Sequence, residues 1–248
     1  LFFDGNRNIT SIDNAASSTL PSLDEALARE LSTIERAGLT RVMRTVTRGE
    51  GVEMLQDGRR VVDFSSNDYL GLAGDPRIAR AAVQALTTGS TGAAAARLIS
   101  GTQAAHVELE REIAKFKGAE AALLFPSGYA ANVGTIQAIA GRRDVIYADK
   151  LNHASLIDGA RLSRAEVRVF PHMDLAALRT MLEADAGTFR RRLIVVDGVF
   201  SMDGDIFPLA ELVSIAREFS AWTYVDDAHA TGVLGANGRG SAEHCGVE

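Results

Sequence analysis

Cysteine and lysine are both scarce in this sequence of 248 residues. The single cysteine, Cys245, excludes an internal disulfide framework and fits a reducing compartment, and we interpret it as inert. Only three of the 26 basic residues are lysine, namely Lys115, Lys117 and Lys150. Any chemistry that needs a lysine is therefore restricted to these three positions.

Long apolar runs and a targeting signal are absent too. No run approaches the roughly 18–20 residues that span a bilayer, and residues 1–4 form neither a basic n-region nor an apolar h-region. Because the chain does not start with Met, we interpret its N-terminus as trimmed. The formal net charge of −6 disfavours binding to nucleic acid or to an anionic membrane. We therefore expect a cytoplasmic protein that binds neither.

Segments with helical and strand patterns alternate along most of the chain. The predicted helices are residues 23–37, 75–86, 105–117, 129–140, 154–162, 174–184 and 208–219. The predicted strands are residues 60–64, 121–125, 144–148, 166–170, 192–196 and 221–225. This alternation predicts an α/β fold with a mainly parallel, doubly wound sheet. We expect an N-terminal arm and extension over residues 1–60 and a large ligand-binding domain over residues 61–248.

The most informative stretch runs from Asp226 to His229, directly after the last predicted strand. An acid and an imidazole at the carboxyl end of a buried strand suit a heteroaromatic cofactor. The acid can pair with a protonated ring nitrogen, and the imidazole can meet a ring oxygen. Pyridoxal 5'-phosphate (PLP) is such a cofactor. The alternative is an aspartate that caps the next helix and a histidine that packs beside it.

Other polar clusters follow three more predicted strands. Ser127 and Gly128 precede a helix whose N-terminal N–H groups can bind an anion such as a phosphate. Tyr129 and His153 can each lie against a bound aromatic ring, and Ser201 follows a further strand. A capping turn, a core tyrosine and a capping histidine are the alternatives. Because the carboxyl ends of parallel strands meet at one sheet edge, we expect all four clusters to form one site.

The sequence lacks the patterns that are typical of several other kinds of site. A hydrolase elbow needs glycine where Phe125 stands. The glycines of residues 235–240 are in the wrong order for a dinucleotide-binding loop. No spacing of histidine, cysteine and acidic residues resembles a metal site. We therefore expect no metal.

Five sequence strings resemble the α-oxoamine synthase family of fold-type I PLP enzymes. They are residues 64–72, 127–132, 151–159, 197–204 and 225–232. The resemblance implies an enzyme with a fold-type I aminotransferase-like large domain, whose C-terminal small domain is missing here. It also implies PLP as cofactor and a homodimer with active sites built from both subunits.

The resemblance assigns roles to individual residues. The backbone of Gly128 and Tyr129 lies near the cofactor phosphate, and Ser201 lies beside the cofactor. The implied catalytic residues also contact PLP: His153 stacks on the pyridine ring, Asp226 holds the ring nitrogen protonated, and His229 hydrogen-bonds the ring oxygen.

The implied reaction is the decarboxylative condensation of an amino acid with an acyl-CoA, and Arg41 and Asn67 are implied to bind these substrates. Residues 197–204 and 226–235 favour the members that join L-alanine to pimeloyl-CoA in biotin synthesis. Residues 99–103 and 239–241 also resemble members that act on glycine and acetyl-CoA. Both substrate pairs stay open at this point.

A PLP enzyme of this kind needs a lysine that binds the cofactor covalently. The family places this lysine in a Thr-x-x-Lys stretch beyond the Asp-x-x-His motif, and none of the three lysines here has that position. We therefore expect an N-terminal fragment of a longer enzyme, with the lysine beyond residue 248. A noncatalytic relative that has lost the lysine is the alternative.

Overall fold

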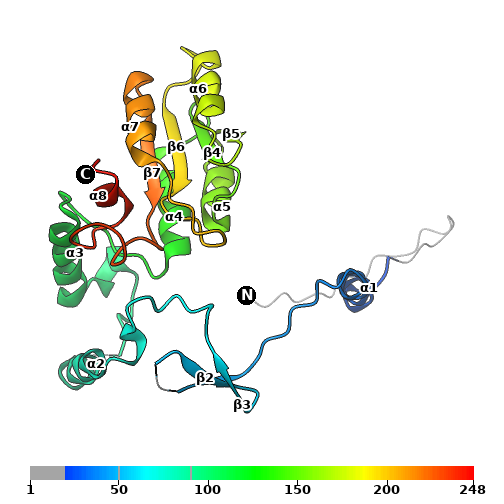
Figure 1. The fold of residues 1–248 in the computed structure, drawn as a ribbon, viewed down its shortest axis with the longest axis vertical. Coiled ribbons are helices and arrows are strands. Elements are labelled where there is room, and N and C mark those ends of the chain that lie inside the picture. Colours follow the sequence, from blue (N-terminus) through cyan, green and yellow to red (C-terminus); the bar gives the residue numbers. More distant parts are fainter. Residues whose placement is uncertain (1–19, 50, 90) are drawn as a thin grey trace, which may run out of the picture. The chain divides into compact units, whose positions relative to one another are not determined.

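The structure, a computed structural model, describes residues 20–248 except residues 50 and 90. Residues 1–19 of the predicted arm lie outside the described residues. The chain divides into two compact units, Leu1–Phe64 and Ser65–Glu248 (Figure 1).

The first unit contains one helix and a small antiparallel sheet. Helix α1, Leu23–Arg36, agrees with the predicted helix and begins at a capping box in which the Ser22 and Glu25 side chains each accept the other's backbone N–H. Strands β1 (Val46–Arg48), β2 (Glu53–Gln56) and β3 (Arg59–Val62) pair in the order β1-β2-β3. Asp57 and Gly58 turn the chain between β2 and β3 at φ 49° and 78°, the backbone of a tight hairpin.

A four-stranded parallel sheet organises the second unit. Its strands are β4 (Val145–Asp149), β5 (Glu166–Phe170), β6 (Arg192–Asp197) and β7 (Trp222–Asp226). They pair in the order β5-β4-β6-β7, and every pair is parallel. The predicted parallel sheet is confirmed.

Helices cover both faces of this sheet (Figure 1). Helices α4 (Gly128–Ile139) and α5 (Ala154–Ser163) pack on one face, where their apolar residues meet Ile146, Leu193 and Val195. Helices α6 (Leu175–Ala184) and α7 (Leu209–Glu218) pack on the other face. Residues on β4 and β6 alternate between the two cores, as the two-residue period of a strand requires. The doubly wound arrangement is therefore confirmed.

The remaining elements of the second unit are helices outside these two layers. They are η1 (Leu72–Gly74), α2 (Pro76–Thr88), η2 (Arg97–Gly101), α3 (Ala104–Lys117) and α8 (Ser241–His244). Asp75 caps α2, and Gly118 ends α3 in the left-handed conformation. Helices α2 and α3 agree with the predicted helices to within two residues.

The predicted strand at residues 121–125 is wrong. These residues form no strand, and side chains take the place of a strand partner. The Leu124 N–H donates to Glu110 Oε1 (2.8 Å), and Arg97 Nη1 donates to the Leu124 carbonyl (3.2 Å). A strand exists only when a neighbouring strand completes its backbone hydrogen bonds, and an apolar pattern cannot show whether one does.

Within the described ranges, no helix combines the length and the apolar character needed to cross a membrane.

Candidate active site

Predicted site residues of the second unit lie where the strand order of the parallel sheet reverses. The chain runs from β4 to β5 on one side of β4, and then to β6 on the other side. In sheets of this kind the crevice at the carboxyl ends of such strands is where ligands bind. The segments after β4, β6 and β7 reach this edge.

Asn152 closes the gap between the ends of β4 and β6. Its side-chain Nδ2 donates to the Val195 carbonyl (2.8 Å), and its Oδ1 accepts the Asp197 N–H (3.3 Å). These two bonds continue the ladder beyond the last paired residues, Ala148 and Val195. Asn152 is buried, so the chain enters α5 from a fixed point.

His153 is held at the start of α5. Its backbone N–H donates to Asp197 Oδ2 (2.7 Å). Its ring Nδ1 accepts the Ser155 N–H (3.3 Å) and lies 2.7 Å from Ser155 Oγ. Since a backbone N–H can only donate, Nδ1 is an acceptor, and the neutral ring carries its hydrogen on Nε2. His153 is thus a capping residue, and its ring is also exposed at the sheet edge.

Asn132 connects His153 to Asp226. Its Nδ2 donates to Ser155 Oγ (2.8 Å) and to Asp226 Oδ2 (2.7 Å). Its Oδ1 accepts from the Tyr224 hydroxyl (2.8 Å). Sequence reasoning missed Asn132 and Ser155 as site residues. The only signal in the sequence was a polar residue, Asn132, on a largely apolar helix. Such a residue indicates a site only when it is known to be buried.

Two carboxyl groups lie side by side at the ends of β6 and β7. Asp197 and Asp226 are partners in the strand register, and Asp197 is buried. Burial raises the pKa of the Asp197 carboxyl to about 6; the His153 N–H opposes this rise, and the charge of Asp226 adds to it. In the part of the chain that the structure describes, neither carboxyl forms a salt bridge. The site therefore has two adjacent carboxyl groups without a salt-bridge partner in the described residues.

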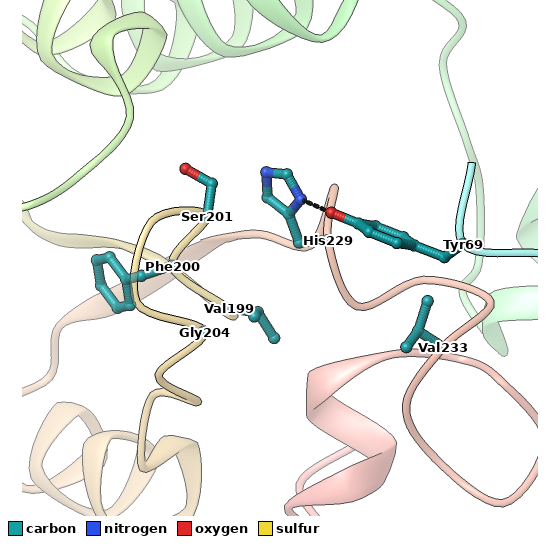
Figure 2. A pocket seen from close by; sticks show the side chains of 7 residues that line it. All are labelled: Tyr69, Val199, Phe200, Ser201, Gly204, His229 and Val233. Carbon is teal, nitrogen blue, oxygen red and sulfur yellow. Dashed lines mark hydrogen bonds between the residues drawn. The ribbon is translucent and has the colours of Figure 1, made fainter. Parts of the chain in front are cut away.

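A small pocket brings together two further predicted residues, Ser201 and His229. It encloses about 200 Å³ and is lined by Tyr69, Val199, Phe200, Ser201, Gly204, His229 and Val233 (Figure 2). His229 Nδ1 lies 2.7 Å from the Tyr69 hydroxyl, and that hydroxyl lies 3.3 Å from Asn67 Oδ1. Ser201 and His229 therefore line one pocket, and Asn67 is linked to His229 through the Tyr69 hydroxyl.

The N-terminus of α4 supplies free backbone donors. Ser127 caps the helix by accepting the Ala130 N–H (3.1 Å). Gly128 and Tyr129 occupy the first turn, where N–H groups have no intrahelical acceptor. The space that a Cβ at Gly128 would occupy is empty to 4 Å. Asn132 is one helical turn further on, so this helix start is close to the Asp226 carboxylate.

Tyr129 and Arg41 are less directly connected to the site. The Tyr129 hydroxyl donates to Asp158 Oδ2 on α5 (2.9 Å), and this hydrogen bond raises the pKa of Tyr129. Arg41 is exposed and belongs to the first compact unit, so its predicted contact with substrate stays a prediction. Across the described positions, no three His, Cys, Asp or Glu side chains are placed to hold a metal ion.

The residues present suit PLP. A helix N-terminus with free N–H groups fits a phosphate. An uncompensated carboxylate at Asp226 fits a protonated ring nitrogen, which would supply the missing positive charge. The exposed imidazole of His153 offers a flat surface for an aromatic ring.

Comparison with known proteins agrees with this chemistry. Residues 59–247 match the family aminotransferase class I and II. The chain is 54% identical over 223 residues to 8-amino-7-oxononanoate synthase from Geotalea daltonii, which covers 90% of this chain and 57% of that protein. The enzyme of the same name from Geobacter metallireducens is 52% identical over 225 residues, which cover 91% of this chain and 57% of that one. The chain thus spans a little over half the length of these relatives.

Solved structures give the same assignment. Serine palmitoyltransferase from Sphingomonas wittichii superposes with a TM-score of 0.82 at 32% identity, covering 93% of this chain and 58% of that one. 8-Amino-7-oxononanoate synthase from Francisella tularensis superposes with a TM-score of 0.64 at 32% identity, over 75% of this chain and 51% of the other. A similar serine palmitoyltransferase from S. paucimobilis was solved with bound PLP. The chain therefore belongs to the aminotransferase class I and II family of PLP-dependent enzymes and, within it, to the α-oxoamine synthases.

Proposed function

We propose that the protein containing this chain is an 8-amino-7-oxononanoate synthase. In this reaction L-alanine and pimeloyl-CoA condense to 8-amino-7-oxononanoate, with release of CO₂ and coenzyme A. The observation that carries the proposal is the 54% identity over 223 residues to a relative of that name. Because the chain spans 57% of that relative, the proposal concerns the protein as its gene encodes it.

PLP, when bound, supplies a pyridinium ring that withdraws electrons from the amino-acid α-carbon. Asp226 holds the proton on the ring nitrogen, since its carboxylate is partly buried and has no salt-bridge partner among the described residues. His153 packs against the ring, and His229 hydrogen-bonds the ring oxygen. The N–H groups of Gly128 and Tyr129 hold the phosphate, and Ser201 lies beside the cofactor.

Asn67 and Arg41 bind the substrates in this proposal. The contact from Asn67 through the Tyr69 hydroxyl to His229 supports the placement of Asn67 beside the cofactor. The lysine that binds PLP covalently is none of the three in this sequence. Lys117 Nζ already lies 3.0 Å from Asp227 Oδ2, which supports this part of the proposal. Borohydride reduction followed by peptide mapping identifies the modified lysine.

The substrate pair is tested by measuring release of coenzyme A. Pimeloyl-CoA and acetyl-CoA are each combined with L-alanine and with glycine, using the full protein loaded with PLP. We expect the highest kcat/KM with L-alanine and pimeloyl-CoA. A preference for glycine and acetyl-CoA would identify a glycine C-acetyltransferase instead. Bound PLP without release of coenzyme A from any pair would support a noncatalytic relative.

We also propose that the full protein is a cytoplasmic homodimer, as the family resemblance implies. Light scattering on the eluate of a size-exclusion column measures its mass in solution. A monomeric mass at micromolar concentration would contradict the homodimer.

A further inference from the structure

We propose that Asn132 and Ser155 are positioning residues of the cofactor site. They fix the plane of the Asp226 carboxylate and the tautomer of the His153 ring. This inference rests on the proposed function, because it concerns how the chain prepares these two side chains for PLP.

The side-chain amide of Asn132 is buried and fully used. It contacts two elements through three residues: α5 through Ser155, and β7 through Tyr224 in its middle and Asp226 at its end. An ionised carboxylate can only accept hydrogen bonds, so Nδ2 must face Asp226. The oxygen Oδ1 must then face Tyr224, whose hydroxyl donates. The orientation of the amide is thus determined by its partners.

The donor and acceptor roles at Asn132 determine those at Ser155 and, through Ser155, those at His153. Ser155 Oγ accepts one N–H of Asn132, so its own hydrogen is available for His153 Nδ1. The Ser155 backbone N–H points to the same ring nitrogen. His153 Nδ1 therefore faces only donors, and the hydrogen of the neutral ring lies on Nε2. A neutral ring can stack on a cationic pyridinium without charge repulsion.

The same amide fixes the Asp226 carboxylate. Asn132 Nδ2 holds Oδ2 at 2.7 Å, and the Ala228 N–H holds Oδ1 at 3.0 Å. With both oxygens held, the carboxylate cannot rotate toward the neighbouring Asp197. Among the described residues Ser155 forms no hydrogen bond with Asp226, so two substitutions separate the two roles. Ser155→Ala removes the Oγ donor to His153 Nδ1 and keeps the backbone N–H, whereas Asn132→Ala removes both the N–H that orients Ser155 Oγ and the N–H that holds Asp226.

The test uses the full protein with ¹⁵N-labelled histidine and with bound PLP. In the wild type we expect the ¹⁵N resonance of His153 Nδ1 to be that of a nitrogen without hydrogen. We expect Ser155→Ala to change the Nδ1 and Nε2 signals of His153 while the PLP dissociation constant changes less than twofold. We expect Asn132→Ala to change the same signals and to weaken PLP binding roughly tenfold.

Two further variants keep the test decisive. Asn132→Asp preserves shape but places an oxygen against Asp226 Oδ2, and we expect PLP binding at least as weak as in Asn132→Ala. Gln137→Ala is the matched control on α4, since Gln137 is exposed and its side-chain amide donates to the Val133 carbonyl of the same helix. Circular dichroism verifies that each variant is folded. His153 signals unchanged in both Ser155→Ala and Asn132→Ala would overturn the inference. Absence of coenzyme A release by the wild type would instead overturn the proposed function.

Discussion

Asp197 is an acid held in a place where its charge is unfavourable. It is 6% exposed, it lies beside Asp226 in the strand register, and its pKa is raised from 3.8 to about 6. A group whose pKa is higher in the folded state than in the unfolded state stabilises the fold below its ordinary pKa. This stabilisation is lost as the pH rises through the pKa of the folded state. Without a bound cation, the ionisation of Asp197 therefore lowers the free energy of unfolding near neutral pH.

We predict that Asp197→Asn stabilises the protein without PLP above pH 6. The asparagine keeps an oxygen for the His153 N–H and removes the charge. The gain in the free energy of unfolding is expected to be near zero at pH 4 and about 1–3 kcal/mol at pH 8. Urea unfolding of both proteins across this pH range measures it. A difference that does not change with pH would contradict the prediction.

The individual site residues differ in how well the sequence predicts them. Asp226 and His229 follow a recognisable strand, and His153 follows another, so position along the chain predicts the edge at which they lie. Asn132 and Asp226 are 94 residues apart, and no local pattern shows that one amide joins them. Long-range partners of this kind require the fold before they can be identified.

At the scale of elements, an ion pair connects the chain between β7 and α8 to helix α3. Lys117, at the end of α3, donates from Nζ to Asp227 Oδ2 (3.0 Å), to Thr231 Oγ1 (3.1 Å) and to the Arg239 carbonyl. Asp227 also accepts the backbone N–H of Ser241 at the start of α8 (3.1 Å). One ion pair therefore anchors the chain between β7 and α8 to α3.

We predict that Lys117→Met destabilises the protein by about 1–3 kcal/mol. The substitution keeps the length of the side chain but leaves the half-buried Asp227 without its cation. Lys115→Met is the control, since Lys115 is exposed on the same helix. Thermal unfolding of both variants measures the difference. Equal melting temperatures for the two variants would show that the ion pair does not stabilise the fold.

A second contact joins the loops after β5 and β6. His172 Nδ1 lies 2.9 Å from Asp149 Oδ1, and its Nε2 lies 3.3 Å from Asp205 Oδ2. Its ring also packs edge-on against Phe200, a lining residue of the small pocket, with 4.4 Å between the ring centres. Burial alone would lower the pKa of His172, but the hydrogen bonds and charges of Asp149 and Asp205 outweigh burial and raise it.

We predict that His172 makes the protein less stable as the pH rises above neutrality. The raised pKa means that its stabilisation is complete below 6.5 and is lost as the pH passes the folded value. The neutral ring keeps one hydrogen and can donate to only one of its two carboxylates. His172→Gln should remove about 0.5–1.5 kcal/mol of this pH dependence, as followed by thermal unfolding between pH 6 and 9. His106→Gln, on α3, is the control and should leave this pH dependence of stability unchanged.

The regular elements were largely predictable from the sequence, and the exceptions have physical reasons. Helices and buried strands have strong periodic patterns, so the predicted helices and the four strands of the parallel sheet agree with the structure closely. Strands β1 and β2 were missed because they are short and mostly exposed. Residues 121–125 have the composition of a strand, but the backbone of Leu124 bonds to the side chains of Arg97 and Glu110 instead.

At the scale of the whole molecule, the two compact units differ in how much core they contain. None of the described residues 20–64 is buried, and α1 buries none of its side chains. In the second unit, β4 is fully buried and β6 nearly so, between two apolar cores. Stability is therefore concentrated around the central strands.

Hydrogen exchange measured by mass spectrometry should reveal this difference. We predict that amides of β4 and β6 exchange slowest and open only with global unfolding. Amides of α1 should exchange at least about 100-fold faster, because few tertiary contacts oppose their local opening. Similar protection in α1 and β4 would contradict this distribution of stability.

The position of β7 has a practical consequence. Among the described strands it pairs only with β6, so its outer edge presents a row of backbone N–H and C=O groups without strand partners. Such an edge is a template on which a strand from another molecule can add. A preparation of this chain on its own should therefore aggregate through β7 at high concentration, and a charged substitution of the exposed Thr223 should delay the turbidity.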